Sequence, residues 1–162
     1  MNIRNAKLSD LEAIYNLECL NFQPDEIIPY SVIQDYLSKT PDSVVVIEDN
    51  ESLVAYCIST VSNSKTISDD LFKSYRPCES NCAYLMILSL SIHPLYQGQG
   101  LGTMLLAVLK DYCHHKSYLG LSLTCHDYLI SYYEMNGFKE LGVSDSTFGN
   151  QLWFDMFLNM TE

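Results

Sequence analysis

Apolar residues in the first forty positions recur at helical spacing after a short opening strand. Residues 2–7 are expected to form that strand. Ser9 and Glu12 have the spacing of a capping box with serine as the N-cap, which predicts the start of a helix. Residues 22–29 break the pattern and predict a loop, and residues 31–37 predict a second helix that ends before a proline. The apolar positions of the first helix are Leu11, Ile14, Leu17 and Leu20.

The middle of the chain carries β-branched and apolar runs that predict three strands. Residues 43–48 and 53–61 are two such runs, and the turn residues at 49–51 join them into an expected hairpin. A polar stretch follows, within which residues 69–75 predict a short helix. Residues 84–92 form an apolar run too short for a core helix, so we expect a central strand there.

The second half begins with a glycine-rich turn at residues 97–102 and continues as a strongly amphipathic helix. Residues 119–124 predict a strand, residues 127–135 a short helix, and residues 138–143 and 151–158 two final strands. This order, β-α-α-β-β-(α)-β-α-β-α-β-β, predicts a mixed α/β sheet with helices on its faces. The expected apolar stripe of the long helix is Leu101, Met104, Leu105, Val108, Leu109 and Tyr112.

Size and composition fit one domain over residues 1–162, with 48% apolar residues to build a core. No stretch is long and apolar enough to cross a bilayer, and the chain starts without a signal-peptide pattern, so we expect a cytoplasmic protein that does not bind membranes. Twenty acidic residues against nine basic ones argue against nucleic acid as a partner. The negative charge suits attraction of amines, or serves solubility alone.

Six cysteines are expected to be free thiols in a reducing compartment. Cys78 and Cys82, together with His114 and His115, hint at a metal site. No second cysteine pair and no suitably spaced histidine pair completes it, so no metal is expected.

The sharpest signal for function is the glycine-rich turn between the central strand and the long helix. Gly98, Gly100 and Gly102 remove the Cβ atom at alternate positions, so the backbone can curl and bring N–H groups close to an anion. The start of the following helix adds a positive partial charge, which predicts a phosphate or pyrophosphate site. Gly102 is followed by Thr103 rather than lysine, which excludes a P-loop, and the spacing does not fit a Rossmann fingerprint.

The pattern Gln97-x-x-Gly100-x-Gly102 resembles the pyrophosphate loop of the GNAT superfamily of N-acetyltransferases, Gln/Arg-x-x-Gly-x-Gly/Ala. Tyr133, followed by Gly137-Phe138, resembles that family's second signature. The resemblance implies a GNAT-type mixed, mostly antiparallel central sheet, with helices on both faces and splayed central strands. It also implies acetyl-CoA or coenzyme A as the co-substrate.

The resemblance assigns roles residue by residue. The pantetheine arm of the co-substrate would pair with the central strand at Leu90 and Ile92, and the backbone N–H of Leu90 would stabilise the oxyanion. Tyr133 would be the general acid; because Tyr132 lies about 100° away around the helix, we expect only one of the two to face the cofactor. His126 stands where relatives carry an asparagine near the cofactor. The cofactor-binding loop would be Gln97, Gly98, Gln99, Gly100, Leu101 and Gly102.

Three segments resemble the arylalkylamine N-acetyltransferase branch: the polar insert at 67–82, residues 124–127 and residues 148–154. That branch carries two histidines on the central strand, but Met86 and Leu88 occupy those positions here. Neither side chain can accept a proton. The general base is therefore open between His126, water relayed through Ser89, Ser91 or a strand carbonyl, and no strong base at all.

We expect an N-acetyltransferase that moves the acetyl group of acetyl-CoA to a primary amine by direct attack in a ternary complex. The alternative is a catalytically weakened acyl-CoA-binding or interaction module of the same fold. A small-molecule amine is the expected partner, and a homodimer is left open. Two sets of residues are candidates for the acceptor wall, one aromatic and one acidic: Phe22, Tyr30, Phe72 and Tyr75, or Asp25, Glu26, Asp69 and Asp70.

Overall fold

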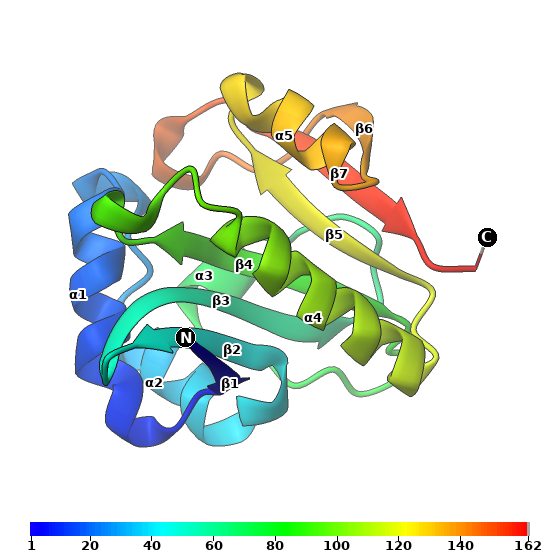
Figure 1. Ribbon diagram of the computed structural model, residues 1–162. Coiled ribbons are helices and arrows are strands. Elements are labelled where there is room, and N and C mark those ends of the chain that lie inside the picture. The colour runs from blue at the N-terminus through cyan, green and yellow to red at the C-terminus, as the bar shows by residue number, and fades with distance from the viewer. Residues whose placement is uncertain (162) are drawn as a thin grey trace.

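The computed structural model describes residues 1–161 of the chain, and its elements follow the expected order (Figure 1). The first strand, β1 (Asn2–Asn5), precedes two helices, α1 (Leu11–Asn21) and α2 (Tyr30–Lys39). The hairpin of β2 (Val44–Asp49) and β3 (Ser52–Ser62) follows. The remaining elements are α3 (Asp70–Lys73), β4 (Tyr84–Ile92), α4 (Leu101–Lys116), β5 (Gly120–Cys125), α5 (Ile130–Met135), β6 (Lys139–Val143) and β7 (Phe154–Asn159).

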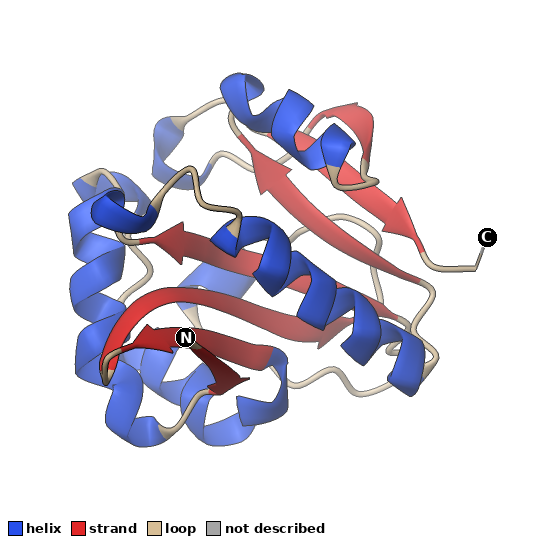
Figure 2. Cartoon of the chain, viewed as in Figure 1, coloured by secondary structure: helices blue, strands red, loops and turns tan. Residues whose placement is uncertain are grey.

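The strands form one sheet of seven in the order β1-β2-β3-β4-β5-β7-β6, and every neighbouring pair is antiparallel except β4 and β5. Helices cover both faces: α1 and α2 lie on one and α4 on the other (Figure 2). Alternate residues of the strands supply the two cores. Cys57 and Leu85 pack in the cluster that contains the α4 side chains, and Tyr56 and Met86 in the cluster of α1 and α2. The expected mixed sheet with helices on both faces is confirmed.

The two central strands separate along most of their length. Only Tyr84–Met86 of β4 pairs with β5, opposite Gly120–Ser122. Leu88 has no partner in the register with β3, which passes from Ile87 opposite Ser59 to Ser89 opposite Ile58. Such a bulge bends a strand and increases its twist. The expected splay of the central strands is therefore present, with a bulge at its start.

Two local predictions for the helices were wrong. Ser9 does not cap α1, because residues Leu8–Asp10 form a 3-10 turn, and the Asp10 carboxylate accepts the Lys7 backbone N–H at 2.7 Å. On α4, Met104 is 38% exposed, whereas Leu106 is fully buried. The buried face of α4 is thus rotated from the predicted stripe toward Leu106, since the sheet beneath it decides which side chains are covered.

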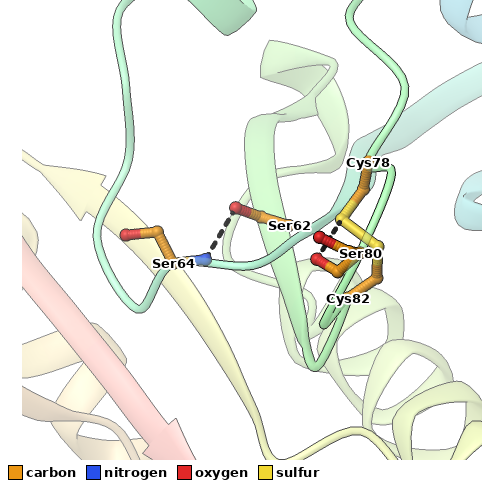
Figure 3. The surroundings of a disulfide bond; sticks show 5 residues. All are labelled: Ser62, Ser64, Cys78, Ser80 and Cys82. Atoms are coloured by element: carbon orange, nitrogen blue, oxygen red, sulfur yellow. Dashed lines mark hydrogen bonds between the residues drawn. A yellow bond between two sulfur atoms is a disulfide. The ribbon is translucent and has the colours of Figure 1, made fainter.

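The expectation of six free thiols was also wrong. Cys78 and Cys82 form a disulfide in the segment between α3 and β4, with their Cα atoms 6.0 Å apart (Figure 3). Asn81 between them adopts a left-handed conformation with φ of 55°, so the chain turns back on itself. Sequence spacing alone did not reveal that turn. The four other cysteines are free, as expected: Cys19, Cys57, Cys113 and Cys125. Among residues 1–161, no helix is long and apolar enough to cross a membrane.

Candidate functional site

A continuous cleft runs across the splay between β4 and β5. It consists of a cavity of about 440 Å³ beside the glycine turn, here named the glycine-loop cavity, and a cavity of about 600 Å³ beside Glu18 and Glu26, here named the acid cavity. The two cavities share a set of lining residues, so they adjoin one another. The shared residues are Asn21, Phe22, Leu90, Leu129 and Tyr133.

The glycine turn forms one end of the cleft through an unusual backbone path. Gly98 and Gly100 have φ angles of 76° and 83°, which L-residues with side chains rarely adopt. The path leads directly into the first turn of α4, whose free N–H groups and positive dipole end favour an anion. The Gln97 side chain braces the turn by donating to the Ile92 carbonyl at 3.1 Å. Gln99 is exposed and does not line the cavity.

The β4 edge forms the floor of the cleft. The backbone N–H of His93 donates to Val54 on β3 at 2.8 Å, so strand alternation directs the N–H groups of Leu90 and Ile92 away from β3. That is the side on which β5 diverges after Met86. The Leu90 N–H is thus presented to the cleft at the junction of the two cavities.

Tyr133 lies at the same junction, on α5. Its side chain is only 7% exposed and lines both cavities. Burial raises the pKa of the phenol, so the hydroxyl stays protonated at neutral pH and can donate a proton. Tyr132 lines the glycine-loop cavity as well, so both tyrosines border this cavity. Only Tyr133, however, reaches the acid cavity too.

Glu18 on α1 is a site residue that the sequence did not single out. It is 1% exposed, and its carboxylate lines the acid cavity. Oε2 accepts the Ile28 backbone N–H at 2.9 Å, while Oε1 accepts the hydroxyls of Tyr56 on β3 and Ser89 on β4, the latter at 2.7 Å. Burial raises the pKa of Glu18 above its ordinary value. A signal was available, because Glu18 lies four residues after Ile14 on the apolar face of its helix.

A second buried acid, Glu26, also lines the acid cavity and is 8% exposed. His126 Nε2 is 3.2 Å from Glu26 Oε1, a contact that becomes an ion pair when the imidazole is protonated. The imidazole stacks on Trp153, with ring centroids 4.2 Å apart, and on Tyr128 at 5.4 Å. The structure therefore places His126 in the acid cavity and not among the residues beside the glycine turn.

The predicted acceptor walls are only partly brought together. Phe22, Glu26 and Phe72 line the acid cavity. Tyr30 instead donates to Glu12 at 2.7 Å, and Tyr75 packs edge-on against Tyr36. Asp25, Asp69 and Asp70 do not line this cavity.

Met86 and Leu88 are core residues of β4, at 0% and 8% exposure. Both pack in the apolar cluster of α1 and α2, and Leu88 also borders the acid cavity. Neither position therefore presents a polar group to the cleft. Across residues 1–161 there is no cluster of three or more His, Cys, Asp or Glu side chains able to hold a metal ion.

Comparison with known proteins gives one family and a set of structural neighbours. A sequence model described as the acetyltransferase (GNAT) family matches residues 11–138. No curated protein sequence matches the chain. The loading GNATL domain of CurA from Lyngbya majuscula superimposes with a TM-score of 0.80 at 17% identity, covering 98% of this chain and 97% of that one.

Two proteins from Escherichia coli and Salmonella typhimurium are also similar. The ribosomal-protein-S18-alanine N-acetyltransferase from Escherichia coli gives a TM-score of 0.71 at 20% identity, over 99% of this chain and 94% of that one. The structure of yncA from Salmonella typhimurium with its cofactor acetyl-CoA gives a TM-score of 0.72 at 21% identity. The match covers 100% of this chain and 95% of that one. At these identities the likeness to the solved structures establishes the fold.

Proposed function

The chain belongs to the acetyltransferase (GNAT) family, whose model matches residues 11–138, and from this premise we propose that it transfers the acetyl group of acetyl-CoA to a primary amine in a ternary complex. One observation carries the proposal: a cavity beside the glycine turn adjoins a cavity lined by two buried acids, with Leu90 and Tyr133 lining both. Two reactants entering from opposite ends would bring their reacting atoms together at that junction. The similar yncA structure, solved with acetyl-CoA, supports the choice of co-substrate.

The glycine-loop cavity suits the pyrophosphate and pantetheine parts of coenzyme A. Backbone N–H groups of Gly100, Leu101 and Gly102, which line this cavity where α4 begins, would hold the phosphates, since helix N-termini bind anions. The open edge of β4 at Leu90 would pair with the amides of the pantetheine arm as an added strand does. The fit to coenzyme A therefore depends on the backbone geometry of the glycine turn and on the separation of β4 from β5.

Acetyl-CoA supplies an activated acetyl thioester, and the residues of the junction supply the polar groups that acetyl transfer needs. The Leu90 N–H would stabilise the negative charge that develops on the carbonyl oxygen. Tyr133 would give its hydroxyl proton to the departing thiolate, because burial keeps the hydroxyl protonated and the side chain lies at the junction.

The acid cavity suits a small cationic amine. Two buried carboxylates, Glu18 and Glu26, lie in its walls, and opposite charge attracts an ammonium group into a partly buried site. Trp153, Phe148 and Phe72 add aromatic surface, with Phe72 and Phe148 stacked at 4.3 Å. These walls match an amine with a flat apolar body, the class named by the arylalkylamine branch that the sequence resembles.

We expect coenzyme A to raise the melting temperature, and acetyl-CoA to release free thiol when a suitable amine is added. At a ligand concentration about 100-fold above Kd, binding adds about 2.7 kcal/mol of stability, which is several degrees for a chain of this size. A thermal-shift assay and a thiol assay with a panel of primary amines measure the two effects. An absent shift would contradict the proposal. A shift without thiol release from any amine would favour a coenzyme A-binding module.

We expect Glu26→Gln to raise KM for the amine about tenfold and to leave kcat within about twofold. The substitution keeps the shape of the side chain but removes the charge that would hold the ammonium group, and a charge-assisted hydrogen bond contributes about 1.5–3 kcal/mol. Steady-state kinetics at saturating acetyl-CoA measures both constants. Asp70→Asn is the matched control, because it removes the same charge from an exposed position outside the acid cavity. Equal KM values in the two variants would remove Glu26 from amine binding.

A further inference from the structure

We propose that Ser89 and Glu18 form a proton relay for the acceptor amine, in which Ser89 Oγ takes a proton from the ammonium group and passes its own to Glu18. The inference rests on the proposed acetyl transfer and names the base for it. Neither Met86 nor Leu88 can do this work, because both are apolar. The relay lies one residue from the Leu90 N–H, where the attacked carbonyl would bind.

The bulge in β4 explains why Ser89 can reach Glu18. Strict alternation would place Leu88 and Ser89 on opposite faces of the sheet. Because the register skips Leu88, Ser89 instead lies on the same face as Leu88, toward α1. Its hydroxyl donates to Glu18 Oε1 at 2.7 Å, and both residues line the acid cavity. Bulges commonly redirect a side chain in this way near active sites.

The setting of Glu18 suits a proton acceptor. Its carboxylate is almost fully shielded from solvent, and it takes part in none of the ion pairs found within residues 1–161. Burial raises the pKa of this carboxyl, although the three donated hydrogen bonds oppose the shift, so Glu18 binds a proton more strongly than a carboxylate in water does. It thus gains basicity from its burial while the three hydrogen bonds keep it in place.

The protons balance across the whole reaction. One proton leaves the ammonium group through Ser89 to Glu18, and the neutral nitrogen forms a bond to the acetyl carbon. The C–S bond breaks as Tyr133 protonates the sulfur, and the second nitrogen proton restores the Tyr133 hydroxyl. Glu18 then returns its proton to solvent through Ser89 after the product leaves. The sum is amide, free thiol and one proton from an ammonium ion and a thioester.

Glu18 sets the expected pH dependence of kcat/KM, and other titratable groups lie around it. On the sheet side Tyr56 donates to the same oxygen, and Tyr15 lies near Glu18 on α1. Since the base must be ionised, kcat/KM rises with pH as Glu18 loses its proton. The titratable groups that share the acid cavity are Glu26, Cys125, His126, Asp127, Tyr128 and Tyr133.

The test compares two deletions of a hydroxyl bonded to the same Glu18 oxygen. Ser89→Ala removes the hydroxyl that lines the cavity, and Tyr56→Phe removes one that is fully buried and outside the cavity lining. We expect Ser89→Ala to lower kcat/KM about 100-fold near pH 7, and Tyr56→Phe to stay within about threefold of wild type. The loss in Ser89→Ala should shrink at high pH, as the amine arrives already neutral. Glu18→Gln should show the same pH profile as Ser89→Ala.

The outcomes separate the relay from the proposed function. If wild type releases no thiol with any amine, acetyl transfer fails and the relay fails with it. If wild type turns over and Ser89→Ala stays within threefold of it at every pH, the relay alone is overturned. Equal losses in Ser89→Ala and Tyr56→Phe would also overturn it, because they would show that Glu18 only clamps the Ile28 segment to the sheet. Should Glu18→Gln not fold, the two hydroxyl variants still decide the question.

Discussion

Replacing Tyr133 with phenylalanine is expected to lower kcat about 100-fold while coenzyme A binding stays close to wild type. The substitution removes one hydroxyl and keeps the ring that packs against Tyr132 and Phe138 at centroid distances of 5.1 and 5.7 Å. Proton transfer by a positioned side chain contributes about 10² to 10⁴ in rate. The thiolate would then leave unprotonated, and the chemical step should slow without loss of the cleft. Single-turnover kinetics and a coenzyme A titration measure the two effects separately.

The control for Tyr133→Phe is Tyr112→Phe. Tyr112 lies on α4, is partly buried and stacks edge-on against Tyr118, outside both cavities. Loss of the Tyr112 hydroxyl should leave kcat within about twofold of the wild-type value. If Tyr133→Phe kept a wild-type kcat, or lost kcat and coenzyme A binding in equal measure, the tyrosine would be a packing residue and the thiolate would leave without its help.

The local sequence pattern was enough to predict the helices and strands, but not the irregularities that depend on contacts with other parts of the chain. The strand at 84–92 was predicted with its observed limits, because a continuous apolar run of that length has few other solutions. The bulge at Leu88 has no signal in that run, since it depends on the register with β3. The Cys78–Cys82 disulfide likewise depends on a turn at Asn81 that the spacing alone does not specify.

The two ends of the cleft differed in how much the sequence could reveal. Gly98, Gly100 and Gly102 lie within one stretch of five residues, so the motif and the anion site that it predicts could be recognised directly in the sequence. The acid cavity is assembled from α1, the bulge of β4, the end of β5 and the segment near Trp153. Glu18 and Ser89 are 71 residues apart in the chain, and only the pairing of α1 with the sheet brings them together. A site of this kind depends on how the helices and strands pack together, which is difficult to predict from a single sequence.

At Gly102 a contact with Tyr132 favours glycine over alanine, a reason that the family pattern does not contain. That pattern accepts glycine or alanine at this position, and the φ of Gly102 is not left-handed, so the backbone itself tolerates alanine. A Cβ atom at Gly102 would, however, approach Tyr132 Oη closer than 3.0 Å, a separation that real Cβ atoms essentially never show. Tyr132 lines the glycine-loop cavity beside that position. Its hydroxyl therefore occupies the space that alanine would need.

We expect Gly102→Ala to weaken coenzyme A binding about tenfold, because Tyr132 must swing out of place and disturb the glycine-loop cavity. In the double variant Gly102→Ala, Tyr132→Phe the next contact of the new methyl group is 3.4 Å, to Cζ of the ring, which is close to ordinary van der Waals separation. Binding should then return to within about threefold of wild type, a coupling of about 1 kcal/mol in a double-mutant cycle. Isothermal titration of the four proteins with coenzyme A measures it.

The melting temperature of the same four proteins distinguishes steric exclusion from loss of the loop backbone. Alanine is a better helix former than glycine by up to about 1 kcal/mol, and Gly102 is the second residue of α4. In Gly102→Ala this gain is opposed by the displaced tyrosine, whereas in the double variant it should remain and raise the melting temperature above that of Tyr132→Phe. If both alanine variants bound coenzyme A equally weakly, the anion site would depend on the glycine backbone itself, and the contact with Tyr132 would be incidental.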